Sequence, residues 1–142
     1  MLKGISPILS PELLKILMEM GHGDELVIGD GNFPAASMGR RLVRLDGHGV
    51  PEILEAILAL YPLDSYSEAP VALMQVTPGD DVVPEIWDRY REIVEKHEGK
   101  VRFEEVERFD FYQRAQAAYC VVATGETALY ANIILKKGVV TE

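Results

Sequence analysis

The chain of 142 residues has the length of one domain, and its 48% apolar and 26% charged residues are the balance of an ordinary globular protein. A formal net charge of −9 argues against binding to nucleic acid, whose phosphates repel an acidic surface, and is compatible with a neutral polar ligand. No apolar run is long enough to span a bilayer, and Pro7 and Pro11 interrupt the start before a signal-peptide core can form, so we expect a cytoplasmic protein without a membrane partner.

The first predicted elements are a helix and a short strand joined by a glycine-rich turn. Ser10, Pro11 and Glu12 are typical of a helix start, with a side-chain cap, an early proline and an acid near the positive end of the helix dipole. The helix places four apolar residues on one side, namely Leu13, Leu14, Leu17 and Met18. We expect Gly21 to end this helix and residues 25–28 to form a buried strand.

Strands and helices continue to alternate in the middle of the chain. Short apolar runs predict strands at residues 42–45 and 71–74. Between them a helix is predicted to begin at Pro51, because apolar residues follow it at helical spacing. Residues 30–34 and 77–81 are rich in Gly, Asp and Pro, which are frequent in turns, and are predicted to be loops.

The last third of the chain predicts two helices and three strands. The more regular helix begins at Pro84 and ends before Gly99. Its apolar stripe comprises Ile86, Trp87, Tyr90, Ile93 and Val94, with His97 in the last turn. A second helix is predicted at residues 109–118. The strands are predicted at residues 101–106, 120–123 and 133–135.

Strands separated by helices along the whole chain predict an α/β fold, in which helices cover the faces of a sheet. The sequence contains no internal repeat, linker or low-complexity segment, so we expect residues 1–142 to form a single domain. Residues 131–135 are apolar on both faces, which is typical of a central strand or of a segment that packs against another subunit. We expect this segment to be buried in an oligomer.

One short stretch has the character of a catalytic turn. His22 lies between Gly21 and Gly23, so its backbone is free to adopt positive φ and its side chain is uncrowded. An imidazole with a pKa of about 6.5 gives or takes a proton at neutral pH. The same residues also fit a simpler interpretation, in which Gly21 caps the helix and His22 lies in a solvated turn. These residues alone leave both interpretations open.

Other reactive side chains have simpler structural explanations. Cys120 stands in an apolar run and is interpreted as a small buried hydrophobe. His48 is assigned to a turn before a helix, and His97 to packing or capping at the end of one. The histidines lack the spacing of metal ligands, and the chain has neither a phosphate-binding glycine loop nor a serine nucleophile elbow. We therefore expect no metal site.

Five polar residues stand next to predicted strand ends, namely His22, Asp30, Arg108, Tyr130 and Asn132. Ligands of open α/β sheets gather outside the strand ends, where loops converge. One histidine with several hydrogen-bonding partners suits proton transfer on a hydroxylated ligand. The spacing leaves open whether His22 and Tyr130 lie on the same side of the sheet.

Motifs spread over nearly the whole chain match a known family in the same order. The matching segments are residues 2–7, 10–14, 20–25, 32–35, 62–66, 107–112, 124–130 and 132–139, together with Asp30. On these residues the chain resembles the family that contains the L-fucose mutarotases and the D-ribose pyranases. Within that family it is most similar to the L-fucose mutarotase branch.

The resemblance implies a three-layer α/β/α domain with a central mixed β-sheet, and a ring-forming oligomer, commonly a homodecamer, whose sites lie where subunits meet. It implies no cofactor. It also implies that His22 is the proton donor for a monosaccharide substrate, L-fucose. The residues that it implies for sugar binding are Asp30, Arg108, Tyr130, Ala131 and Asn132.

The implied reaction exchanges α and β anomers through the open-chain aldehyde. His22 would handle the proton of the ring oxygen, while Asp30 and Arg108 hold sugar hydroxyls. Ala131 stands where this branch usually has glycine, and alanine is familiar there from the ribose branch, whereas Arg108 favours fucose. Three alternatives stay open, namely a pyranase that interconverts pyranose and furanose forms, a non-catalytic sugar-binding protein, and a purely structural ring.

Overall fold

Helices and strands alternate along the chain in the computed structural model, which describes residues 1–141. The helices are α1 (Pro11–Glu19), α2 (Ala35–Met38), α3 (Val50–Leu58), α4 (Ile86–Glu98) and α5 (Arg108–Ala117). The strands are β1 (Glu25–Gly29), β2 (Leu42–Leu45), β3 (Val71–Met74), β4 (Phe103–Val106), β5 (Cys120–Thr124) and β6 (Ile133–Lys136). This alternation confirms the predicted α/β class, and the short α2 lies where the sequence predicts no element. Within residues 1–141 no helix has the length and apolarity needed to cross a bilayer.

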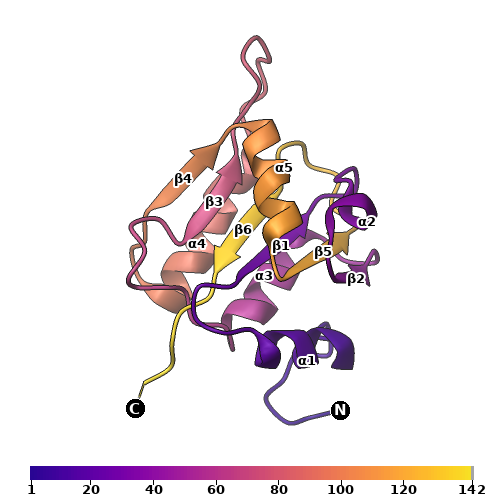
Figure 1. The fold of residues 1–142 in the computed structure, drawn as a ribbon, viewed down its shortest axis with the longest axis vertical. Coiled ribbons are helices and arrows are strands. Elements are labelled where there is room, and N and C mark those ends of the chain that lie inside the picture. Colours follow the sequence, from indigo (N-terminus) through magenta and orange to yellow (C-terminus); the bar gives the residue numbers. More distant parts are fainter. Residues whose placement is uncertain (142) are drawn as a thin grey trace.

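The six strands form one mixed sheet in the order β2-β5-β1-β6-β3-β4 (Figure 1). β5 pairs in parallel with β1 and with β2, and β3 pairs in parallel with β4. β6 lies between β1 and β3 and runs antiparallel to both. As a result β1 to β5 all end where β6 begins. We call this end of the sheet the carboxyl end and the opposite one the amino end.

Helices cover both faces of the sheet, which confirms the three-layer α/β/α architecture (Figure 1). Successive side chains of a strand point to opposite faces. Leu26 and Ile28 of β1 therefore pack with residues of α1, α3 and α4, whereas Val27 packs with residues of α2 and α5. Tyr90 of α4 and Phe111 of α5 are fully buried on the two faces.

The apolar segment at residues 131–135 is buried within the chain itself. β6 contains most of this segment, and its Ile134 is paired with Val27 of β1 on one side and Ala72 of β3 on the other. Both faces of the strand are covered by helices. The prediction that an oligomer buries this segment is therefore wrong, because its two apolar faces are those of a central strand.

The first helix differs from its prediction at its end and on its buried face. Ser10 caps it as predicted, through its side-chain hydroxyl. The backbone becomes extended at Met20, so the helix ends before Gly21 and Gly21 lies outside it. Ile16 completes the buried face, whereas the predicted Met18 is 86% exposed. The helical period places Ile16 above Met20 on the core side and turns Met18 to the opposite side.

Candidate functional site

Four of the predicted site residues gather at the carboxyl end of the sheet. Asp30 directly follows β1, and Asn132 directly precedes β6. The backbone N–H of Asp30 donates a hydrogen bond of 2.7 Å to Oδ1 of Asn132, and both residues are buried. Tyr130 and Ala131 precede Asn132 on the same loop. Two segments that are far apart in the sequence are thus joined at one point.

Asp30 is a buried carboxyl group whose ionisation the fold disfavours. Burial raises the pKa of Asp30 above its ordinary value, and nearby backbone N–H groups, including that of Asn32 at 3.0 Å, offset this only in part. The negative charge of Glu126 raises the same pKa further. A carboxyl group held in this way is suited to hydrogen-bond the hydroxyls of a neutral ligand.

Tyr130 has an unusual backbone conformation beside this carboxyl group. Its φ of 55° makes it the single non-glycine residue with positive φ in the part of the chain that the structure describes. Its hydroxyl donates to Oδ2 of Asp80 at 2.7 Å and accepts from the N–H of Thr77 at 3.3 Å. Both partners belong to the loop between β3 and α4, which projects at the top of Figure 1. Tyr130 therefore anchors this loop at the site.

Arg108 begins α5 shortly after β4 and so lies at the same end of the sheet. Its Nε donates to the hydroxyl of Tyr112 at 3.1 Å, and its guanidinium lies 5.5 Å from the ring centroids of Phe109 and Tyr112. The hydrogen bond to Tyr112 is the main cause that raises the pKa of Arg108, and the phenol of Tyr130 contributes to it. The exposed guanidinium has further N–H donors that suit sugar hydroxyls.

His22 lies at the amino end of the sheet, away from the other predicted site residues. Its turn precedes β1, and the next residue, Gly23, has a φ of 88° and donates its N–H to the carbonyl of Lys137 at 2.8 Å. Asp30 follows the opposite end of β1, whose five residues span roughly 13 Å. Within one chain the structure does not bring His22 to the sugar-binding candidates. His22 and Tyr130 therefore lie at opposite ends of the sheet.

His22 has a partner that the sequence analysis did not single out. Nε2 of His22 lies 3.0 Å from Oδ1 of the buried Asp64, and the ring of Tyr66 lies 5.5 Å from the imidazole. Burial alone raises the pKa of Asp64, but the hydrogen bonds with His22 and with the N–H of Tyr66 outweigh it and hold the pKa below its ordinary value. A carboxylate in this position orients an imidazole for proton transfer. In the sequence, the one indication of a role for Asp64 is that it lies within residues 62–66, which match the family.

The loop after β5 supports the carboxyl end through two further residues that spacing did not reveal. Oγ1 of Thr124 donates to the carbonyl of Gly29 at 2.7 Å. The carboxylate of Glu126 accepts from the backbone N–H groups of Val50 at 3.1 Å and Ala128 at 3.0 Å. These bonds fasten the loop that carries Tyr130 to the start of α3.

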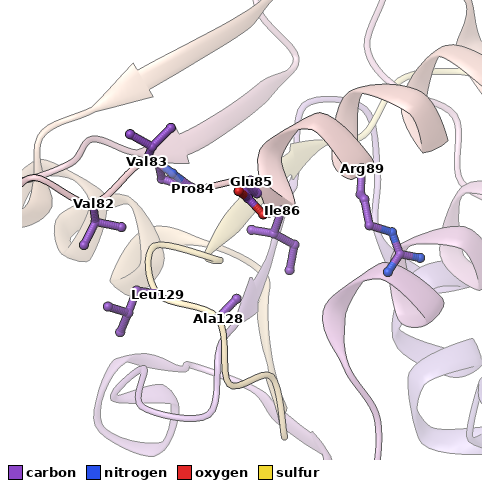
Figure 2. A pocket seen from close by; sticks show the side chains of 8 residues that line it. All are labelled: Val82, Val83, Pro84, Glu85, Ile86, Arg89, Ala128 and Leu129. Carbon is purple, nitrogen blue, oxygen red and sulfur yellow. The ribbon is translucent and has the colours of Figure 1, made fainter.

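A cavity of about 620 Å³ adjoins the Tyr130 segment (Figure 2). Residues 82–86 and Arg89 line one side, and Ala128 and Leu129 line the other. Figure 2 shows these two walls coming from the start of α4 and from the loop before β6. The lining is mostly apolar and does not include Asp30. The hydrogen-bonding groups of the candidate site therefore lie beside this cavity and outside it.

His48 and His97 each lie beside a carboxylate that the sequence analysis did not assign to them, whereas Cys120 is buried as predicted. Nδ1 of His48 lies 3.1 Å from Glu52, and Nε2 of His97 lies 3.0 Å from Glu55. Burial raises the pKa of the Cys120 thiol to about 12. Among residues 1–141, no three His, Cys, Asp or Glu side chains are grouped as metal ligands would be.

Comparison with known proteins decides the family. The sequence profile of the RbsD / FucU transport protein family matches residues 3–140. The chain belongs to this family. The match covers every helix and strand of the sheet described above, and both ends at which the candidate residues lie.

Relatives of this RbsD / FucU family member are similar over nearly their whole length. An L-fucose mutarotase of Actinobacillus pleuropneumoniae serotype 5b is 56% identical over 140 residues, which cover 98% of this chain and 97% of the relative. A fucose mutarotase of Homo sapiens is 51% identical over 145 residues, which cover 97% of this chain and 94% of the relative.

Solved structures of related proteins have the same fold. A fucose mutarotase of Streptococcus pneumoniae in complex with L-fucose has a TM-score of 0.95 and 53% identity, and the match covers 99% of this chain and 100% of that one. RbsD of Bacillus subtilis complexed with D-ribose has a TM-score of 0.75 over 99% of this chain and 100% of that one, at 22% identity. The second likeness concerns the fold alone.

Proposed function

We propose that this RbsD / FucU family member is an L-fucose mutarotase, an isomerase that interconverts the α and β anomers of L-fucopyranose. The observation that carries this proposal is the Streptococcus pneumoniae relative, which binds L-fucose and matches 99% of this chain at 53% identity with a TM-score of 0.95. The relatives from Actinobacillus pleuropneumoniae and Homo sapiens are named for the same activity.

Anomer exchange needs proton transfer at two oxygens of the sugar. The bond between C1 and the ring oxygen breaks as the ring oxygen gains a proton and the anomeric hydroxyl loses one, which gives the open-chain aldehyde. Rotation about the C1–C2 bond and the reverse steps close the other anomer, so no atom is gained or lost. We assign the ring-oxygen proton to His22, which Asp64 orients at 3.0 Å. General acid–base catalysis of this kind contributes about 10²- to 10⁴-fold.

The sugar hydroxyls are assigned to the residues at the carboxyl end of the sheet. Asp30 accepts and Arg108 donates, whereas the hydroxyl of Tyr130 already donates to Asp80 and therefore offers the sugar its oxygen as an acceptor. The amide oxygen of Asn132 accepts the N–H of Asp30, and its NH₂ group donates to Sδ of Met74 at 3.9 Å, so the second hydrogen of the NH₂ group is assigned to the sugar. The side chain of Ala131 is fully buried, so this residue contributes through its backbone.

A complete site on this assignment requires two copies of the chain. The His22 of one copy meets the carboxyl end of the next in a head-to-tail contact, and such contacts close into a ring when the rotation between copies permits it. Both ends carry exposed apolar side chains, with Val83 and Leu129 at the carboxyl end and Tyr66 and Val140 towards the amino end. A homodecamer stays the predicted size of this assembly, and the cytoplasm its predicted location.

Magnetisation-exchange NMR on equilibrated L-fucose, with and without the protein, tests the proposed activity. We expect faster exchange between the anomers, and loss of this acceleration in a His22→Gln variant that keeps the wild-type circular dichroism spectrum. Acceleration for D-ribose alone would favour a pyranase. No acceleration for either sugar would favour a sugar-binding protein without catalysis. Light scattering at micromolar concentration tests the assembly, and a monomer would contradict the shared site.

A further inference from the structure

The segment of residues 130–132 needs support from outside itself, because Tyr130 has a φ of 55°. Residues other than glycine rarely adopt this conformation, which crowds the Cβ atom against the backbone and persists where surrounding contacts fix it. The same segment contains three of the residues assigned to sugar binding. Whatever fixes its backbone therefore also fixes the sugar site.

Helix α4 donates two hydrogen bonds to this segment. Nε1 of Trp87 donates to the backbone carbonyl of Tyr130 at 2.7 Å. The hydroxyl of Tyr90 donates to the backbone carbonyl of Ala131, also at 2.7 Å. Trp87 and Tyr90 are three positions apart and so share one face of the helix. Two successive carbonyls of the loop before β6 are thus held by a single rigid element.

Both donors are enclosed by the protein. Tyr90 is fully buried, and Trp87 is 8% exposed. Burial raises the pKa of Tyr90, and neighbouring carboxylates add to the effect, so its hydroxyl stays a neutral donor. On the other side the N–H of Asp30 holds Oδ1 of Asn132 at 2.7 Å. The segment is therefore clamped between α4 and the end of β1.

We propose that Trp87 and Tyr90 are positioning residues of the sugar site, an inference that rests on the proposed mutarotase function. They contact the segment through its backbone carbonyls. Through these bonds they keep the Tyr130 hydroxyl and the Asn132 amide in the arrangement that receives the ligand. Loss of either bond releases the strained backbone, so the affinity for the sugar falls. Proton transfer by His22, which lies at the other end of the sheet, is retained.

Tyr61 provides a matched control for Tyr90. It is also buried, and its hydroxyl donates to the backbone carbonyl of Leu135 at 2.9 Å. Tyr61→Phe and Tyr90→Phe therefore remove the same group from the same kind of bond, at opposite ends of β6. We expect similar losses of stability from the two substitutions. The bond from Tyr90 alone reaches the sugar-binding segment.

The experiment measures L-fucose anomer exchange against sugar concentration, and amide hydrogen exchange at residues 128–133, in the wild type and three variants. We expect Tyr90→Phe and Trp87→Phe to raise KM about tenfold and to change kcat less than about threefold. Both are expected to speed amide exchange in this segment. Tyr61→Phe is expected to leave KM and this amide exchange at their wild-type values.

Two outcomes separate this inference from the function on which it rests. Equal KM values and equal amide exchange for Tyr90→Phe and Tyr61→Phe would overturn the positioning role. The bond from Tyr90 would then have no effect on the sugar site beyond that of any buried tyrosine bond. A wild type that does not accelerate L-fucose exchange would overturn the proposed function instead. If Tyr90→Phe does not fold, the same comparison is made with Trp87→Phe, whose aromatic ring still fills the site.

Discussion

His22 and Asp30 lie at opposite ends of the same strand, β1. His22 is held by Asp64 at the amino end of the sheet, and the backbone of Asp30 is bonded to Asn132 at the carboxyl end. Neither end combines a proton donor with the groups assigned to sugar binding. On the proposed function, the catalytic site therefore forms where two copies of the chain meet. A substitution at one end in one copy is expected to be compensated by a neighbouring copy in which that end is intact.

A variant without the proton donor and a variant with weakened sugar binding are expected to restore activity when they assemble together, measured at L-fucose concentrations below the wild-type KM. His22→Gln lacks the proton donor, and Asp30→Asn lacks the carboxylate. In rings of randomly mixed copies, about one contact in four joins an intact His22 to an intact Asp30. After joint refolding from urea, exchange NMR on L-fucose is expected to show about a quarter of the wild-type activity. An inactive co-refolded sample would contradict the shared site, and variants refolded separately are the control.

Removing the charge of Asp64 is expected to lower the rate more than the affinity. Asparagine still accepts the N–H of Tyr66 but no longer pairs with a protonated His22, so we expect kcat to fall about tenfold or more with KM little changed. Glu52→Gln is the matched control, because it alters a similar pair with His48 at 3.1 Å outside the site. Equal kinetics for the two variants would argue against a role of Asp64.

The free energy of unfolding is expected to depend on pH in part through the carboxylate of Asp64. Burial raises the pKa of Asp64, but its hydrogen bonds with His22 and Tyr66 outweigh burial and lower it overall. Such a group stabilises the fold above its unfolded pKa of about 4, and the contribution is lost as the pH falls through the lower folded pKa. Urea titrations from about pH 5 to pH 2 are expected to show a larger loss of unfolding free energy in the wild type than in Asp64→Asn. Parallel profiles would contradict this.

The substitution Asp30→Asn is expected to stabilise the fold while it weakens sugar binding. Burial raises the pKa of Asp30, so the ionised group destabilises the folded chain at neutral pH. This penalty fades as the pH falls through the raised pKa, and asparagine still accepts the N–H of Asn32. We expect a higher unfolding midpoint at pH 7, a smaller difference towards about pH 3, and a KM for L-fucose about tenfold higher or more. An unchanged midpoint at pH 7 would be evidence against this electrostatic account.

A methyl group at Gly125 is expected to disrupt the loop behind the site. A Cβ atom at this position would lie 2.1 Å from the carbonyl oxygen of Asp46, so one of the two backbones has to move. We expect Gly125→Ala to lower the unfolding free energy in urea by about 1–3 kcal/mol, as overpacked sites do. Gly47→Ala is the control, because a Cβ there has no heavy atom within 4 Å. Equal losses in the two variants would show that the contact is relieved without cost.

Most helices and strands could be predicted because their signals lie within a few residues of one another. The cap at Ser10 and the helical stripe that contains Trp87 and Tyr90 are of this kind, and α1 and α4 begin close to where the sequence places them. The sequence predicts that Gly21 ends α1, but the backbone already becomes extended at Met20. The helix therefore ends without a glycine in the left-handed conformation. Local signals therefore locate elements well and their ends less well.

The sequence by itself determined the family, the α/β class and the candidates for the site, because ordered motifs identify a family and strand ends attract polar residues. The tertiary structure alone decided which candidates meet. The bond between Asp30 and Asn132 joins positions 102 residues apart, and it exists because β6 runs antiparallel beside β1. The same strand order places His22 at the far end with Asp64. Strand order and direction are set by packing over the whole sheet, which spacing along the chain does not encode.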